Sequence, residues 1–314
     1  MECQLLLEWD DMLNGMGTER IDVYMTQGYH ELYRTDAARP VCFAAQGESG
    51  EYLLPGILHD PICDGMGYCF ESAYGYGGPV STSADRAFIT EASDAVLETF
   101  HRAGVTRARL RFHPVLENHC LVGPEWQVTY SRNTAGIDLT GAPVDILRAM
   151  HPKHRNMVSR AQRLGLEFVW DPELEHVGEF KALYNGTMDR LQADGAYYYD
   201  DAYYRLLNAG LGERVALGVV LDDGVVVSSA IFLRQGPYGH YHLSGSLTGA
   251  PPGAGQLLVY GAAAALQESG VRTLHLGGGT TPSADDSLLK FKQRFGTLRF
   301  RYHVGEWTAS NTSG

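Results

Sequence analysis

The sequence predicts an α+β protein in which mixed strands and helices form two similar domains. Its 314 residues exceed one typical domain and suit two of ~150 residues each. Strand-like segments between Gly and Ser turns alternate with amphipathic helical segments in both halves. This texture starts again after residues 138–143, which contain Gly and Pro. We therefore expect an N-terminal domain over residues 1–140 and a C-terminal domain over residues 141–314.

In the first half, local patterns predict each element. Apolar residues recur at helical spacing between Ser83 and Gly104, which indicates a helix over residues 83–104. Residues 27–34 look helical, and Arg alternates with apolar residues over 107–113, which is typical of a strand with one charged face. Residues 73–79 are rich in Tyr and Gly and should form a loop. Further strands are expected at residues 41–45, 52–58, 68–72, 126–130 and 135–139.

The second half repeats this mixture. A hairpin turn is expected at Asp222-Asp223-Gly224, because Asp-Gly suits a two-residue turn. Helices are expected at residues 143–150, 153–164, 172–191, 200–209, 253–269 and 284–294. Strands are expected at residues 167–170, 214–221, 225–234, 239–243, 273–276 and 298–303. No long charged heptad pattern is visible, so we expect no coiled-coil arm and no barrel.

Composition narrows the class of protein. With 44% hydrophobic and 20% charged residues, the chain can bury a core. The start lacks the basic and apolar regions of a signal peptide, and no stretch reaches the ~18 apolar residues of a membrane helix. The five cysteines include no C-x-x-C pair, so we expect reduced, buried thiols and no metal site. These features predict a cytoplasmic protein without a membrane span.

The charge is unevenly distributed. A net charge of -12 argues against a general polyanion binder. Yet residues 148–163 and 290–301 each hold five basic residues and no acid, together ten of the 25. A third basic cluster is formed by Arg102, Arg107, Arg109 and Arg111. Such clusters focus positive potential and suit a small phosphate-bearing partner, although solvated helix faces would give the same pattern.

Four segments carry a resemblance to a known family. They are residues 74–79 (YGYGGP), 154–161 (HRNMVSRA), 276–279 (LGGG) and 286–296 (DSLLKFKQRFG). With these segments the chain resembles the Fem-type aminoacyltransferases of the GNAT superfamily over about residues 20–304. The resemblance implies two GNAT-like domains. It also implies transfer of an aminoacyl group from aminoacyl-tRNA to an amine of a peptide acceptor.

Two departures leave the acceptor open. The chain lacks the coiled-coil insertion of some cell-wall members, and residues 187–192 match their substrate helix only loosely. The acceptor is therefore either a nucleotide-linked peptidoglycan precursor or an intermediate of a peptide or nucleoside antibiotic. No cofactor beyond the aminoacyl-tRNA substrate is expected, and the oligomeric state is left open.

Lys292 is the first candidate for catalysis. Only four lysines occur in the chain, and this one stands in the Phe-Lys motif. A cation near the ester carbonyl or the tRNA 3′ end can stabilise developing negative charge. Phe291 would pack beside it or stack on the terminal adenine. A solvated helix lysine is the alternative.

Further substrate-binding residues come from the basic segments and the resemblance. Arg190, Arg155 and Lys153 are candidates for phosphate contacts, because an arginine fork in particular matches phosphate oxygens. Arg34 could act likewise from the first domain, or it could be an ordinary surface arginine. The resemblance adds Tyr76 from the YGYGGP segment.

Tyrosines and histidines supply the remaining candidates. Residues 195–204 hold five tyrosines, Tyr197 among them, which either line an acceptor channel or pack as the start of a helix. Strict alternation along a strand puts Tyr241 and Leu243 on the face opposite His240, His242 and Ser244. The resemblance favours Tyr241 as a substrate contact with a catalytic role. The histidines could be general bases, but a structural role is commoner.

Two alternatives remain open. Gly253-Ala254-Gly255 before a helix could seat a phosphate, as in an acyl-CoA-dependent N-acyltransferase, but residues 251–256 carry no Arg or Lys. The other alternative is a non-catalytic module that binds tRNA or peptide, against which the Phe291-Lys292 pair argues. No nucleophile elbow occurs, so we expect direct transfer without a covalent intermediate.

Overall fold

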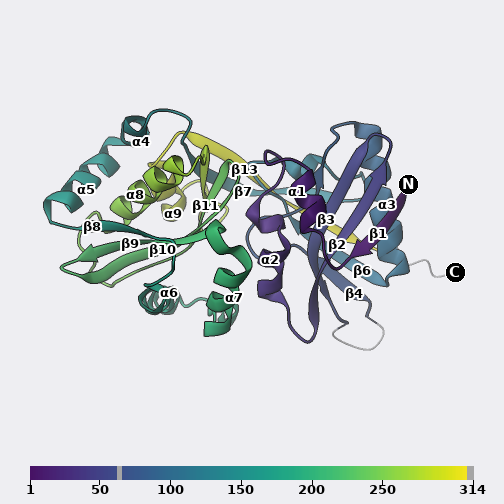
Figure 1. The fold of residues 1–314 in the computed structure, drawn as a ribbon, viewed down its shortest axis with the longest axis horizontal. Coiled ribbons are helices and arrows are strands. Elements are labelled where there is room, and N and C mark those ends of the chain that lie inside the picture. The colour runs from purple at the N-terminus through teal and green to yellow at the C-terminus, as the bar shows by residue number, and fades with distance from the viewer. Residues whose placement is uncertain (62–65, 310–314) are drawn as a thin grey trace. The chain divides into compact units, whose positions relative to one another are not determined.

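The computed structural model describes residues 1–61 and 66–309, and the chain forms two compact units (Figure 1). The first unit holds Met1–Arg132 and the segment from Arg301 onward, and the second holds Asn133–Phe300. Strands β7 (Gln127–Asp138) and β13 (Leu298–Thr308) each run from one unit into the other. The sequence suggested one division near residue 140. The compact units instead divide at 132/133, and the chain returns at 300/301 because the end of β13 pairs with β6.

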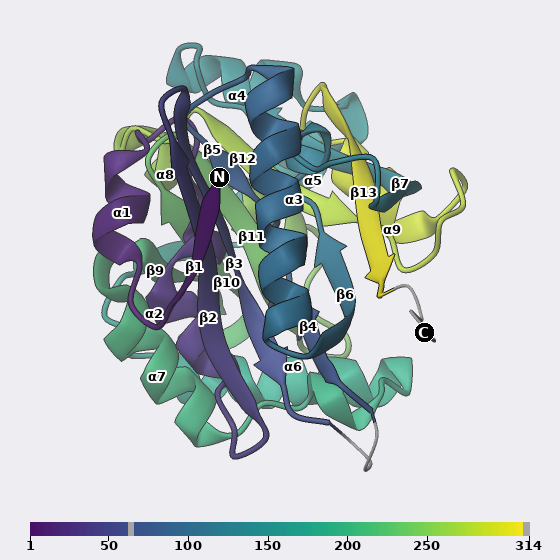
Figure 2. The ribbon, with the colours of Figure 1, turned by 90° about the vertical axis from the view of Figure 1, so that its right-hand side faces the viewer.

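The first unit is built on a mixed sheet in the order β1-β2-β3-β4-β6-β13, with β5 beside β3. Its strands are β1 (Glu2–Leu6), β2 (Ala38–Gly47), β3 (Gly50–His59), β4 (Tyr68–Glu71), β5 (Val80–Ser81) and β6 (Val105–Arg111). Only β4 and β6 run parallel among the pairs described in this unit. The helix α3 (Arg86–Arg102) packs along β1, β2, β3 and β6 (Figure 2).

Alternate residues of β2 and β3 serve two cores. Phe43 packs with Phe70 and Phe100 under α3. The neighbouring residue Cys42 faces a second cluster with Trp9 and residues of α1 (Asp10–Gly15). Both faces of this sheet are therefore covered, as the apolar character of both strands requires. The short helices η1 (Val23–Met25), α2 (Gln27–His30), η2 (Glu31–Tyr33) and η3 (Asn118–Cys120) complete the unit.

The second unit has a sheet in the order β7-β12-β11-β10-β9-β8. Its remaining strands are β8 (Glu167–Asp171), β9 (Val215–Asp222), β10 (Val225–Gln235), β11 (Tyr238–Ser246) and β12 (Thr273–Gly278). β11 and β12 run parallel, and the other described pairs of this unit are antiparallel. Asp223 and Gly224 both have positive φ in the two-residue turn between β9 and β10, as expected for this hairpin.

Helices cover both faces of the second sheet. On one face, α8 (Ala254–Glu268) packs on β8, β9 and β10 and carries α4 (Pro143–Ala149) and α5 (Pro152–Arg163). On the other face, α6 (Val177–Leu191) packs on β10 and β11, with α7 (Asp201–Leu211) near β9 (Figure 1). The short helix α9 (Ser287–Gln293) lies against β12, and η4 (Gly195–Tyr197) and η5 (Gly212–Arg214) are connectors. The mixed α/β fold class is thus confirmed.

Some local expectations were wrong. The two strands expected at residues 126–130 and 135–139 are one strand, β7, because the residues between them stay extended and include no Gly or Pro turn. Among the cysteines, Cys3 and Cys42 are buried, but Cys69 is half-buried and Cys120 is exposed. Cys63 lies outside the described residues. Within residues 1–61 and 66–309, no helix is both long and apolar enough to cross a membrane.

Candidate active site

Two β-bulges interrupt the second sheet at the same level. Opposite β10, the register of β11 shifts so that His242 is an extra residue between Tyr241 and Leu243. Opposite β7, the register of β12 shifts in the same way at Leu276. Among the described residues, the parallel ladder of β11 and β12 ends just before both bulges, at the pair His240 and His275. Bulges increase local twist and redirect side chains, so they account for the parting of residues 241–246 of β11 from residues 276–278 of β12. We call these two segments the splayed strand ends.

The bulge at His242 overturns the expected facing of β11. Tyr241 pairs with Phe232, and Leu243 pairs with the preceding residue of β10, so Tyr241 and Leu243 lie on opposite faces. Tyr241 shares the α8 face with Ser244, whose side chain hydrogen-bonds with it, and its ring lies 5.5 Å from that of Phe232. The prediction from strict alternation was wrong, because one inserted residue moves the side chains that follow it to the opposite faces of the sheet.

Lys292 reaches the splayed strand ends from α9. Its Nζ donates a hydrogen bond to the carbonyl oxygen of Gly278 over 2.8 Å and lies 5.9 Å from the centre of the Tyr241 ring. The ammonium therefore contacts the end of β12 and the face of an aromatic ring on β11. Burial lowers the pKa of Lys292 to about 8, against the raising influence of the Asp286 carboxylate. Lys292 is thus a half-buried lysine and not a solvated one.

Phe291, the residue before this lysine, is part of an aromatic cluster. Its ring centre lies 5.1 Å from that of His154 and 5.0 Å from that of Phe295. The Nε2 of His154 donates to the carbonyl oxygen of Phe291 over 3.1 Å, so α5 and α9 are joined here. Burial lowers the pKa of His154 to about 4, which keeps this histidine neutral and structural at pH 7. The first turn of α8 is adjacent, since a Cβ at Gly255 would lie 3.8 Å from the Phe291 ring.

Arg190 lies at the far end of β11. The guanidinium of this exposed residue donates to the carbonyl oxygen of Ser246 over 2.9 Å and to the hydroxyls of Thr187 and Thr248. These bonds fix Arg190 beside one of the splayed strand ends. Tyr197 is 40% exposed in η4, whereas Tyr203 and Tyr204 of the same tyrosine tract are buried in α7. The tract is therefore divided between core packing and surface.

The two candidates on α5 differ from each other. Arg155 donates to the carbonyl oxygens of Arg148 and Met150 over 3.1 and 3.0 Å, where α4 ends. Those bonds satisfy carbonyls that a helix end leaves without partners, which is a structural task. Lys153 is exposed in the first turn of α5. Its neighbour His154 contacts Phe291, so both residues belong to the helix start that borders α9.

The remaining candidates belong to the first unit. The Tyr76 ring packs against Tyr24, His113 and Tyr302 with centroid separations of 5.4–6.0 Å, and burial raises the pKa of its hydroxyl. The glycine before it has φ +101, and a Cβ there would lie 2.5 Å from the Tyr24 ring, which explains why residue 75 is Gly. Arg34 is engaged in a two-pronged ion pair with Glu31 at 2.6 and 2.8 Å on the surface.

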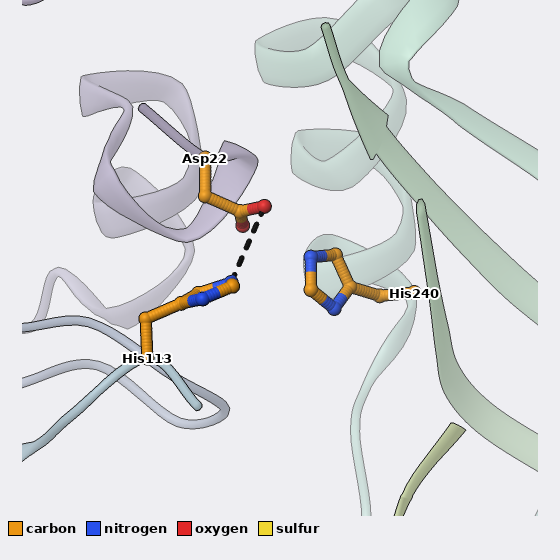
Figure 3. A group of neighbouring side chains, drawn as sticks. All are labelled: Asp22, His113 and His240. Atoms are coloured by element: carbon orange, nitrogen blue, oxygen red, sulfur yellow. Dashed lines mark ion pairs between the residues drawn. The ribbon is translucent and has the colours of Figure 1, made fainter. Parts of the chain in front are cut away.

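Sequence reasoning missed a buried contact between a histidine and an aspartate in the first unit. His113 Nε2 lies 3.4 Å from Asp22 Oδ2, and both side chains are fully buried (Figure 3). The backbone amide of Tyr24 donates to Asp22 Oδ1, and that of Leu116 donates to His113 Nδ1, so the imidazole proton is assigned to Nε2. These residues have no short motif, and only the fold brings them together. In the second unit, the missed residue is Asp286, which caps α9 and which its position before a helix could have revealed.

Comparisons with known proteins agree with this architecture. Residues 152–292 match the family described as Acetyltransferase (GNAT) domain. The crystal structure of FemX has a TM-score of 0.75 with this chain at 12% identity, covering 98% of this chain and 97% of that one. No curated protein has a sequence significantly similar to this chain.

Two further solved structures share the fold. One is the C-terminal domain (DUF2156) of a putative lysylphosphatidylglycerol synthetase from Agrobacterium fabrum, with a TM-score of 0.58, 16% identity and coverage of 95% and 92%. The other is a tandem GNAT protein from the clavulanic acid biosynthesis pathway, with a TM-score of 0.53, 12% identity and coverage of 99% and 100%. The chain therefore shares the fold of FemX and of these two proteins, and residues 152–292 of its second unit match the GNAT domain family.

Proposed function

We propose that this protein is an aminoacyltransferase that moves an aminoacyl group from aminoacyl-tRNA to an amine of a peptide acceptor. The observation that carries the proposal is the ammonium of Lys292, held at the splayed strand ends between the Gly278 carbonyl and the Tyr241 ring. A positive charge fixed in a partly desolvated position stabilises a developing oxyanion more strongly than a solvated lysine does.

The reaction needs no covalent enzyme intermediate. The unprotonated acceptor amine attacks the carbonyl carbon of the aminoacyl ester, and the carbonyl oxygen takes up negative charge. The Lys292 ammonium stabilises that oxygen in the transition state. The bond between the carbonyl carbon and the ribose oxygen then breaks, that oxygen takes the proton lost by the amine and becomes a hydroxyl, and an amide and free tRNA result. Every atom comes from the two substrates.

Charge on the second unit favours a tRNA donor. α5 carries Lys153, Arg160 and Arg163 on its exposed side, and Arg190 is exposed at the end of β11. Phosphates of an acceptor end could be contacted by such cations. The Fem-like fold, shared with FemX and with a lysylphosphatidylglycerol synthetase domain, supports the same class of donor.

The second candidate is transfer from an acyl-CoA. The tandem GNAT protein of the clavulanic acid pathway shares the fold of this chain, and its structure was determined without AcCoA, which names an acyl-CoA as a ligand of that protein. Here Gly253 is the N-cap of α8 and supplies no side-chain cap, so the first amides of the helix could receive a phosphate. The absence of Arg and Lys from residues 251–256 weighs against this candidate.

One assay separates the candidates. The purified protein is incubated with each acceptor class and with either tRNA charged with a labelled amino acid mixture or labelled acetyl-CoA. We expect a labelled amide only from charged tRNA, and we expect ribonuclease added before the protein to abolish it. Product formed only from acetyl-CoA would refute the proposal. Binding of charged tRNA without any product would indicate a non-catalytic module.

A further inference from the structure

The carboxylate of Asp286 has four donors within hydrogen-bond distance. Oδ1 accepts from the backbone amide of Leu289 over 2.9 Å. Oδ2 accepts from the hydroxyl of Thr280 over 2.8 Å and from the amide and hydroxyl of Thr281 over 3.0 and 3.1 Å. These bonds stabilise the charged form and hold the pKa of Asp286 far below its usual range. Asp286 is buried, and the four hydrogen bonds hold its carboxylate in place as a fixed negative charge.

These bonds join two segments that are separate along the chain. Leu289 belongs to the first turn of α9, while Thr280 and Thr281 follow the end of β12. Just before Thr280, the backbone passes close to the carboxylate, because a Cβ at Gly279 would lie only 2.2 Å from Asp286 Oδ1. The Gly-rich sequence after β12 is thereby explained in part, since residue 279 must lack a side chain for this contact.

Lys292 depends on both segments. Its own backbone is in α9, and its hydrogen-bond acceptor, the carbonyl oxygen of Gly278, is at the end of β12. One carboxylate therefore anchors both ends of the bond that orients the ammonium. We propose that Asp286 is a positioning residue that fixes Lys292 at the splayed strand ends. Only the kinetic part of this inference rests on the proposed function.

The negative charge of Asp286 affects the pKa of Lys292, which a residue that only caps a helix would not change. The Asp286 carboxylate raises the pKa of Lys292 and so opposes the lowering caused by burial. Its sequence neighbour Asp285 provides a matched control, because that carboxylate is exposed and pairs with Lys290 at 2.8 Å. The two adjacent acids thus act on two different lysines.

The test is a direct titration of the lysines. With only Lys153, Lys181, Lys290 and Lys292 in the chain, NMR of protein carrying lysine labelled at Cε gives four signals, which Lys-to-Arg variants assign. In Asp286→Asn we expect the pKa of Lys292 to fall by roughly 0.5–1 pH unit, because a neighbouring negative charge is lost. In Asp285→Asn we expect the Lys292 signal to titrate as in the wild type.

Kinetics supply the second readout. In Asp286→Asn we expect kcat to fall about tenfold or more, with KM for aminoacyl-tRNA within about twofold of the wild-type value, since the ammonium acts in the transition state. A folded Asp286→Asn protein with an unchanged Lys292 titration overturns the inference. The titration needs no substrate, so it stands even if the tRNA-dependent activity is not found.

A second variant covers a folding defect. If Asp286→Asn does not fold, Asp286→Ser is titrated instead, because Ser caps a helix about as well and carries no charge. The same fall in the pKa of Lys292 is expected. Failure of both variants to fold would assign Asp286 a purely stabilising role and would also overturn the inference.

Discussion

The Nζ atom of Lys292 donates a hydrogen bond to the backbone carbonyl oxygen of Gly278 over 2.8 Å. This bond connects a helix that follows the sheet with the end of one of its central strands. It exists because two bulges part β11 from β12 and leave the end of β12 accessible to a side chain. The position of the Lys292 ammonium therefore depends on the two bulges in the sheet.

Removal of the Lys292 ammonium should affect turnover much more than folding. For Lys292→Ala we expect kcat to fall about 100- to 1000-fold, the usual effect of losing one group that stabilises an oxyanion. Lys290→Ala is the control, because Lys290 is exposed and pairs with Asp285 on the surface. Steady-state rates and circular dichroism are measured for both variants. Wild-type turnover in folded Lys292→Ala would remove this residue from the mechanism.

The pH profile should reflect the lowered pKa of Lys292. The charged form is the active one, so kcat should fall as the pH rises through about 8 and the amine loses its proton. In Lys292→Arg, whose guanidinium stays charged, the alkaline decline should disappear even if the rate is lower. Rates between pH 6 and 10 test this. A decline that is identical in both proteins would come from another group.

The fold was predictable where local sequence decides the structure. The turn at Asp223-Gly224 and the helix after Ser83 follow from residue types within a few positions. The bulge at His242 was not predictable, because it depends on the register of β10 opposite it. For the same reason, the prediction that Tyr241 and Leu243 lie on the same face of the sheet was wrong. Sequence order likewise does not reveal that the cations of Arg155 and Lys153, two residues apart, have different surroundings.

Neutral His154 should make the protein sensitive to acid. Its pKa is about 4 in the folded chain, against about 6.5 when unfolded, so the unfolded state binds more protons between these values. Stability from this group is therefore present above pH 6.5 and is lost as the pH falls through about 4, by roughly 3 kcal/mol in all. Urea unfolding at pH 7, 5.5 and 4.5 measures the loss. His154→Gln keeps an N–H donor without titrating, and its stability should depend less steeply on pH.

The start of α8 should tolerate a methyl group at one glycine and not at its neighbour. Gly253 has φ +99, and a Cβ there would lie 2.3 Å from the carbonyl oxygen of Met157, so Gly253→Ala should destabilise the protein by at least about 2 kcal/mol. At Gly255 the nearest atom is 3.8 Å away, and Gly255→Ala should range from no effect to about 1 kcal/mol of stabilisation. Urea midpoints compare the two variants. Equal midpoints would mean that α5 and α8 do not pack this closely.

Substitutions of Arg155 should affect the stability of the protein, whereas substitutions of Lys153 should affect tRNA binding. Arg155→Lys keeps the charge, but the shorter lysine side chain does not reach the position from which Nη1 donates to both the Arg148 and Met150 carbonyls, so we expect a loss of about 1–2 kcal/mol in unfolding free energy. Lys153→Ala should leave stability unchanged, because the side chain is exposed. If Lys153 contacts a phosphate, its loss should weaken tRNA binding and reduce the slope of log Kd against log salt concentration by about 1. Binding to uncharged tRNA at several salt concentrations measures that slope. An unchanged slope in Lys153→Ala, together with a reduced slope in Arg155→Lys, would reverse the two roles.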